Sequence, residues 1–386
     1  MGEVSTIGQR IRRLREEQKL SQQELADRAG LDISTIVKLE NGLRRNPRGT
    51  TVLQIANALD AEPATLLGKT ERMGADRDGA RIQAVRDVLL DPDQLPGFEN
   101  DDTGEPATTA DVKQMLKFIG DRYWRGEWGP VIAQLPAAIG EARHAEAHAE
   151  LAQLYEIATY LMGHMGRLDL AWTAVERAMM AAVRSNDQVL WATMHSAASW
   201  VLLHQARVEQ AEKIAGKGAD VIRPQYGGSK NQIAAYGNLL LAAVAPALST
   251  GTDVSEYLRP AKAAATELGS RTPIYLTVFG PTSVALQALY ANTTLHEPAK
   301  ALAASREVNP DDLWAISRGW MDMNVAQAHM ERGHVKAAAS VLLSAARRAP
   351  VFVRHQVQAR ALFEEVRRKE RSHTDTLDKL ATYWPE

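Results

Sequence analysis

The stretch SQQELADRAGLDISTIVKLENG, residues 21–42, decides the fold of the first part of the chain. It opens with Ser21 and, three residues on, Glu24, which together form a capping box at the start of a helix. The apolar spacing that follows extends this helix over 22–29. The stretch therefore begins with a short helix whose first turn is fixed by its own side chains.

A second helix follows almost at once. Gly30 supplies the positive φ of a tight turn, and Asp32 is placed to cap a helix over 33–40, which Asn41-Gly42 ends. Two helices joined by so short a glycine turn form a helix-turn-helix unit. Further short helices are predicted before and after it, at Ile7 to about residue 19, at Thr51–Leu59 and at Pro63–Leu67. The first seventy residues thus form a small five-helix domain.

This arrangement resembles the Xre/Cro-type helix-turn-helix of phage repressors and many bacterial regulators, the lambda-repressor-like fold. The resemblance rests on residues 21–42 together with NP at 46–47, TVLQIANAL at 51–59 and PATLL at 63–67, and covers roughly residues 5–68. It implies that the helix over 33–40 enters the major groove of duplex DNA. A helix-turn-helix of this type can also serve protein contacts without DNA, and that alternative stays open.

The resemblance assigns roles residue by residue. Base edges would be read by Ile33, Ser34, Thr35 and Lys38, with Gln22 bridging a phosphate and a base; phosphates would be held by Asn41, Arg44, Arg45, Arg48 and the backbone N–H groups near Asn41 and Gly42. Ile33 stands where a polar residue is common, so it would contact a thymine methyl. Asp32 is an unfavourable neighbour for phosphate. Taken alone, the basic run RRNPR is typical of a solvated loop.

Charge divides the chain into three parts, although the net charge is only −2. Residues 1–70 hold 11 Lys+Arg against 9 Asp+Glu, whereas residues 71–110 hold 4 against 10. The acidic segment 71–110 is predicted to contain one short helix, over 80–90, and then a flexible loop over 98–109 that acts as a hinge. We expect a DNA-binding domain over 1–70, an acidic linker over 71–110 and a helical domain over 111–386.

Composition excludes several kinds of protein. There is no cysteine, which rules out disulfides and thiolate sites and favours a cytoplasmic location. The longest apolar run, Leu239–Leu248, is about half a membrane span and is interrupted by Pro246, so no membrane association is expected. HAEAH at 144–148 places Glu146 on the wrong side of a helix for a zinc protease. We expect no cofactor, no metal site and no enzymatic activity.

From Asp111 onward the pattern is helical and weakly repetitive, with a period of about 40 residues and one elongated repeat. The recurring strings are GRLDLAW at 166–172, ARVEQAE at 206–212, LHEPAKA at 295–301 and GHVKAAA at 333–339, with matched alanines at 171, 211, 299 and 338 and a poorer copy at 252–258. The segment 121–143, with Trp124 and Trp128 as core residues, fits an incoming repeat. The series resembles tetratricopeptide repeats, which stack into an α-solenoid with a concave inner face.

A helix-turn-helix joined to such repeats resembles a large class of actinobacterial regulators and, in architecture, the peptide-sensing regulators of Gram-positive quorum sensing. That resemblance implies an effector, a peptide or a small molecule, that binds in the concave groove and shifts the DNA-binding state. It also implies a homodimer on an inverted-repeat operator in double-stranded DNA. The alternative is a protein-interaction scaffold, or an antitoxin-like operator binder, whose repeats hold a partner protein.

Side chains that recur at the same offset from each turn are candidates for the groove. An aromatic residue with a histidine one helical turn later occurs as Tyr160 and His164, and again one repeat further on as Trp200 and His204. At this spacing both side chains share one helix face. Asn324 in the last repeat would close the groove with an amide that can bind a peptide backbone. The alternative is that all of these residues only pack one repeat against the next.

Overall fold

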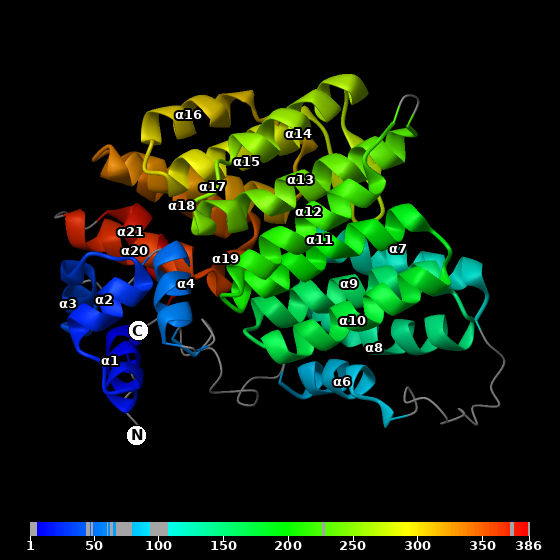
Figure 1. The fold of residues 1–386 in the computed structure, drawn as a ribbon, viewed down its shortest axis with the longest axis horizontal. Coiled ribbons are helices and arrows are strands. Elements are labelled where there is room, and N and C mark those ends of the chain that lie inside the picture. The colour runs from blue at the N-terminus through cyan, green and yellow to red at the C-terminus, as the bar shows by residue number, and fades with distance from the viewer. Residues whose placement is uncertain are drawn as a thin grey trace.

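The computed structural model describes residues 6–43, 47, 49–59, 61, 65–66, 79–92, 107–225, 228–370 and 374–384. Within these ranges the chain is helical apart from one two-stranded hairpin (Figure 1). The elements are α1 (Ile7–Glu17), α2 (Gln22–Ala29), α3 (Ile33–Glu40), α4 (Gly49–Ala58), α6 (Gly79–Leu89), α7 (Thr109–Arg125), α8 (Trp128–His144), α9 (His148–His164), α10 (Leu168–Arg184), α11 (Gln188–His204), α12 (Val208–Ile222), α13 (Lys230–Thr250), α14 (Ser255–Leu268), β1 (Thr272–Ile274), β2 (Thr277–Phe279), α15 (Pro281–Thr294), α16 (Pro298–Glu307), the 3-10 turn η2 (Pro310–Asp312), α17 (Ala315–Glu331), α18 (Val335–Arg348), α19 (Pro350–His355), α20 (Val357–Lys369) and α21 (Asp375–Ala381).

The N-terminal head, α1–α4, has the local geometry that its sequence predicts. The Ser21 hydroxyl accepts from the Glu24 amide and the Glu24 carboxylate accepts from the Ser21 amide, which completes the capping box. Gly30 has φ of 61°, and Asp32 caps α3 by accepting from the Ser34 amide. Of the predicted fifth helix, Thr65 and Leu66 are helical, and its other residues lie outside the described ones. The predicted helix-turn-helix is confirmed.

The helices from α7 to α21 form the C-terminal array, whose first part, α7 to α11, advances in equal steps of one helix and one short turn. Each helix from α7 to α11 is 17 residues long, and the turns between them are short. The residues with positive φ in or beside these turns are Gly126, Glu146, Gly166, Asn186 and Ala206. Two such helices with their turns make one repeat, whose length agrees with the predicted period. The motif HAEAH therefore lies not within one helix but across the turn between α8 and α9.

The turns also correct one match between the repeats. Ala171, Ala211 and Ala338 each stand at the same offset after a positive-φ residue and are fully buried. In the third string the positive-φ residue is His296, so the equivalent position is Ala301, which is buried, whereas Ala299 is exposed. The predicted string is out of register there by one residue, because the turn residue is His296 and not Leu295.

The array closes on itself. Helix α17 contacts α7, and the Trp128 ring of α8 lies 6.3 Å, between centroids, from the Phe352 ring of α19. One hydrophobic cluster runs through both ends of the array as a result. At the C-terminal end α20 and α21 pack on α18, and Trp384 stacks on Phe363. The inner face predicted for a solenoid therefore encloses a space.

The hairpin β1–β2 lies in the elongated repeat and was not predicted. It is antiparallel, and Thr272 pairs with Phe279. It follows α14 and precedes α15, which accounts for part of the long interval between the second and third strings. Nearby, α13 is a helix that is long enough and apolar enough to cross a membrane, judged by length and composition alone. Within the protein, however, 61% of its most apolar window is buried. Such burial is typical of a core helix.

The helix predicted in the acidic segment forms as α6 but does not act as a free linker. Val85 and Leu89 are fully buried in the array's main cluster, and α6 packs on α8. The Arg143 guanidinium of α8 pairs with Asp91, 3.0 Å from Nη1 to Oδ2, and donates to the Val88 carbonyl. The array thus extends back to α6. The predicted flexible loop lies largely outside the described residues.

Candidate functional site

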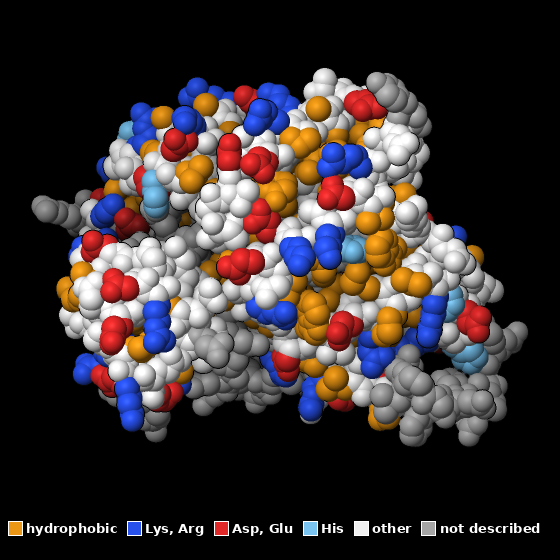
Figure 2. All heavy atoms as spheres, viewed as in Figure 1, with side chains coloured by type: hydrophobic (Ala, Val, Ile, Leu, Met, Phe, Trp, Pro, Cys, Tyr) orange, Lys and Arg blue, Asp and Glu red, His pale blue; other side chains and the backbone are white. Residues whose placement is uncertain are grey.

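The helix expected to read DNA presents its outer face to solvent. Ser34 and Lys38 lie on its less buried side, Ile33 is 38% exposed, and Thr35 lies beside them, while Ile36 and Leu39 fill the head's core. Acidic and basic side chains lie side by side on the visible face of the head (Figure 2). This face of the head is therefore not uniformly basic, and its overall charge gives it no strong attraction for DNA.

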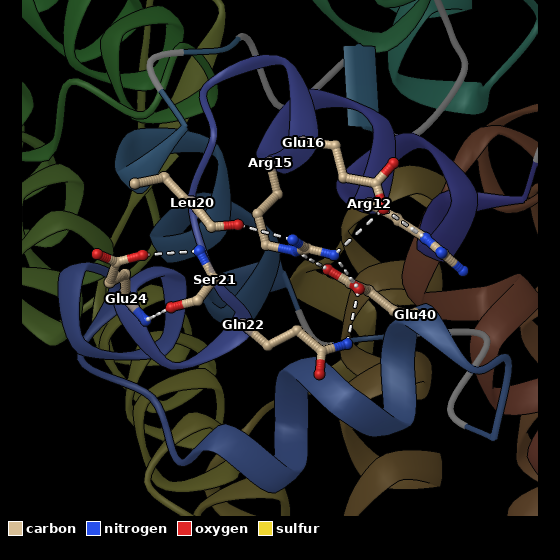
Figure 3. Close-up of polar contacts among 8 residues, drawn as sticks. All are labelled: Arg12, Arg15, Glu16, Leu20, Ser21, Gln22, Glu24 and Glu40. Carbon is tan, nitrogen blue, oxygen red and sulfur yellow. Dashed lines mark hydrogen bonds and ion pairs between the residues drawn. The ribbon is translucent and has the colours of Figure 1, made fainter.

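A buried ion pair, together with one hydrogen bond to it, connects α1, α2 and α3 (Figure 3). Arg15 of α1 holds Glu40 of α3 in a two-bond fork, 2.7 Å from Nε to Oε1 and 2.9 Å from Nη2 to Oε2, and donates to the Leu20 carbonyl. The Gln22 amide donates to the same Glu40 carboxylate over 2.8 Å. The hydrogen bonding to Glu40 is the largest cause of the raised pKa of Arg15. Gln22, a predicted DNA contact, is thus held in place by Glu40 of α3.

The predicted phosphate contacts are only partly visible. The backbone N–H groups of Asn41 and Gly42 donate to the Val37 and Leu39 carbonyls, so the expectation that they hold a phosphate is not supported. The Asn41 residue itself is exposed. Arg44, Arg45 and Arg48 lie outside the described residues.

A cavity of about 520 Å³ lies on the inner face of the array. Six helices supply its walls: α7, α9, α11, α13, α15 and α17, the first member of each pair. The hairpin, η2 and α19 complete it. Cavities of this size are typical of sites for small organic ligands.

The two recurring aromatic and histidine pairs meet in the wall of this cavity. Tyr160, His164, Trp200 and His204 all line it. The Trp200 ring meets the Tyr160 ring edge to face at 5.3 Å between centroids and the His164 ring at 5.1 Å, and it lies 4.0 Å from His204. Spacing by one repeat has therefore brought the two pairs into a single cluster.

Trp200 both packs and lines the cavity. Its six-membered ring enters a notch at Gly163 of α9, where a methyl group would lie 2.3 Å from Trp200 Cζ3. The residue is nevertheless half-buried, not fully buried. One side of the Trp200 ring thus packs against α9, while the residue also lines the cavity, so packing does not exclude a role in ligand binding.

Asn324 is not part of the cavity wall. It is 1% exposed, and its amide donates to the Trp320 carbonyl one turn earlier on α17. Trp320 lines the cavity from that helix. Asn324 follows Trp320 by one turn on the same side of α17, but its short amide is buried and bonded within its own helix, whereas the Trp320 side chain reaches the cavity.

Behind Tyr160 lies a buried carboxyl group. Glu156, on the same helix, is 2% exposed, and burial raises its pKa to about 8. Its partner is the Tyr160 hydroxyl, and burial and Glu156 together raise the Tyr160 pKa. At neutral pH an uncharged carboxyl group therefore lies buried behind the Tyr160 part of the cavity wall.

Sequence reasoning missed most of the remaining wall. Aromatic residues reach the cavity from several other places, as Tyr123, Trp124, Tyr290, Trp314, Trp320 and Phe352. The missed hairpin contributes Thr277 and Val278. Its sequence TPIYLTVF at 272–279, rich in β-branched and aromatic residues between glycines, was the signal that could have revealed it.

Comparison with known proteins connects the head to regulators of transcription. The helix-turn-helix family model matches residues 11–66. The immunity repressor protein of Bacillus phage phi105 is 26% identical over 117 residues, which cover 29% of this chain and 81% of the repressor. The HTH-type transcriptional repressor RghR of Bacillus subtilis (strain 168) is 38% identical over 56 residues, 14% of this chain and 42% of that protein.

Among solved structures, the apo form of ComR from S. thermophilus aligns over 95% of this chain and 99% of its own, with 13% identity and a TM-score of 0.26. The uncharacterized HTH-type transcriptional regulator RghRB of B. subtilis (strain 168) is 39% identical over 126 residues, 30% of this chain and 90% of that protein. With nine tenths of RghRB covered at this identity, and with a complete helix-turn-helix in the head, the chain belongs to the family of helix-turn-helix transcriptional regulators.

Proposed function

We propose that this regulator binds operator DNA through α3 and that an effector, a peptide or a small molecule, binds in the inner cavity and changes the DNA-binding state. The observation that supports this most is the cavity itself, to which all six inner helices contribute. A ligand that fills it contacts every repeat at once. It can therefore stabilise one arrangement of the whole array over another.

The last turn of α11 offers a route from the cavity to the head. Trp200 and His204 line the cavity, and the Nδ1 atom of His204 lies 2.8 Å from the Trp200 carbonyl oxygen. Just after His204, Ala206 is buried in the hydrophobic cluster of the head. A shift of this turn on ligand binding would move the surface on which the head rests. The coupling is a difference in free energy between two positions of one segment.

On DNA, we assign base reading to Ile33, Ser34, Thr35 and Lys38 and to the clamped Gln22, and phosphate binding to Asn41, Arg44, Arg45 and Arg48. We further propose that two copies bind an inverted repeat, because one head offers few base contacts. Lys38→Ala and Ser34→Ala should change which operators are bound, by about 1–3 kcal/mol for each contact. Arg44→Ala and Arg48→Ala should weaken binding to every sequence and reduce its dependence on salt.

Binding to a panel of operator variants at two salt concentrations tests these roles, and footprinting tests the paired half-sites. Equal losses for all four variants on every operator would contradict the assignment of α3 to the major groove.

The effector role is tested with the double variant Trp200→Ala, His204→Ala. It should retain DNA binding in the absence of effector and lose the response to an active extract of the host cells. Because Trp200 also packs in the notch at Gly163 and is half-buried, a moderate fall in melting temperature is expected; if the cluster only packs the repeats, the loss of stability should be as large as for a fully buried tryptophan, about 3–5 kcal/mol. Thermal melting and the response, measured on the same preparation, separate the two outcomes.

A further inference from the structure

The hairpin forms a wall shared by two cavities of the array. It is held at several points: the Tyr275 hydroxyl donates to Asp187 over 2.6 Å, and the Asn238 amide donates to the Thr277 hydroxyl over 2.8 Å. Phe279 is fully buried against Gly237 of α13, where a methyl group would lie 2.0 Å from the phenyl ring. These contacts fix the hairpin as part of the array and not as a loose loop.

The second cavity has a volume of about 320 Å³. Several residues line both it and the larger cavity, namely Trp124, Arg271, Thr277, Val278 and Trp314. Its other walls come from α7, from Gln153 of α9 and from the hairpin. The two cavities therefore adjoin at these residues.

The two cavities differ in charge. The smaller one is lined by three cations, Lys113, Lys117 and Arg271, against one carboxylate, Asp121. Lys113 also pairs with Glu150, 3.8 Å from Nζ to Oε1, while among the described residues Lys117 has no ion pair. The larger cavity shares Arg271 and also contains Asp312, and its other lining residues are aromatic and aliphatic side chains, eight neutral polar residues and two histidines.

We propose that the effector is amphipathic, with an anionic group bound at Lys113, Lys117 and Arg271 and an apolar body in the aromatic cavity beyond Trp124 and Trp314. The proposal rests on the proposed function and names the chemistry of its ligand. The Arg271 guanidinium, 5.7 Å from the Trp314 ring centroid, stands where the two environments meet. A carboxylate is the anion that both a peptide C-terminus and a free organic acid would supply.

Two dyes of similar shape test this without knowledge of the natural effector. Anilinonaphthalene sulfonate carries the anion, and phenylnaphthylamine is its uncharged counterpart. In the full-length protein, Lys117→Gln should lower the affinity for the sulfonate dye about three- to fivefold, as expected for the loss of one exposed ion pair. The affinity for the neutral dye should not change. Added salt should likewise lower the affinity of the sulfonate dye and not that of the neutral dye. Lys336→Gln, an exposed lysine on the outer helix α18, is the matched control.

The outcomes separate this inference from the proposed function. Trp200→Ala should weaken both dyes, because it removes part of the aromatic wall. If Trp200→Ala leaves both dyes unchanged, the larger cavity does not bind ligands and the proposed function fails. If Trp200→Ala lowers the affinity for both dyes but Lys117→Gln lowers neither, the larger cavity does bind ligands, and the proposed anion site is wrong.

A displacement experiment identifies the source of the carboxylate. A hydrophobic tripeptide is compared with its C-terminal amide, and naphthylacetate with naphthylacetamide, as competitors of the bound sulfonate dye. Better displacement by the acid in the peptide pair indicates a peptide effector, and in the other pair a free organic acid. Equal displacement by acid and amide in both pairs would contradict the proposal.

Discussion

The head and the array differ in how far apart in sequence their decisive contacts lie. In the head, the caps of α2 and α3 join residues two or three positions apart, and the longer contact between Arg15 and Glu40 spans 25 positions. In the array, the cavity joins Tyr123 to Gln356. Local contacts can be recognised from a short stretch of sequence, whereas the closing of a solenoid depends on the sum of many small rotations between repeats. The comparison also implies that the two regions can fail independently.

The largest effect is expected from Glu40→Ala in the head. It leaves Arg15, whose side chain is 11% exposed, without its carboxylate, and breaking a buried pair costs about 3–5 kcal/mol. DNA binding should be lost. Calorimetry should show the head unfolding at a lower temperature, while the unfolding temperature of the array is unchanged.

Glu17→Ala is the control for that variant, because Glu17 pairs with Arg13 at the exposed surface and its removal should leave both transitions where they were. A single transition in which head and array shift together would show that the contact at Ala206 makes them one cooperative unit.

The same contrast explains which parts could be predicted from the sequence. The helix boundaries of the head, its caps and the period of the array follow from local signals such as Ser21 with Glu24. The recurrence of aromatic and histidine pairs predicted that Tyr160 and Trp200 lie together. The inward face of α17, the burial of α6 and the position of the hairpin depend on contacts such as Phe352 with Trp128, between segments at opposite ends of the array. No local pattern encodes these contacts.

Glu156 tests the array in the same way that Glu40 tests the head, but with an effect that depends on pH. The folded pKa of about 8 lies above the ordinary value of 4.5, so above pH 4.5 the unfolded chain releases a proton that the folded chain keeps. The stability contributed by Glu156 is therefore complete below about pH 4.5 and is lost as the pH rises to 8. Each pH unit in this window changes it by about 1.4 kcal/mol.

Glu156→Gln removes this loss while keeping the shape of the side chain. Above pH 4.5 its free energy of unfolding should rise steadily relative to that of the parent protein, by about 3 kcal/mol at pH 7. A changed hydrogen bond to Tyr160 would reduce this gain by a constant amount. Denaturant unfolding between pH 5 and pH 8 measures the slope. Glu176→Gln, exposed on α10, is the control and should follow the parent at every pH. A difference between Glu156→Gln and parent that does not change with pH would mean that Glu156 is ionised in the folded protein.

The smallest and most selective change is a single methyl group. Gly163→Ala would place that methyl 2.3 Å from Trp200 Cζ3, so the ring must leave its notch and move toward the cavity. Overpacking of this kind costs about 1–3 kcal/mol, and the displaced ring should also reduce binding of both dyes. Gly216→Ala on α12 is the matched control, since nothing lies within 4 Å of the added methyl; in a helix interior it should stabilise the protein by about 0.5–1 kcal/mol. Because both variants make the same chemical change, opposite shifts in melting temperature isolate the contact with Trp200. If Gly163→Ala were as stable as Gly216→Ala and bound the dyes normally, Trp200 would not occupy the notch, and the cluster it forms with Tyr160 and His164 would have to be abandoned as the wall of the cavity.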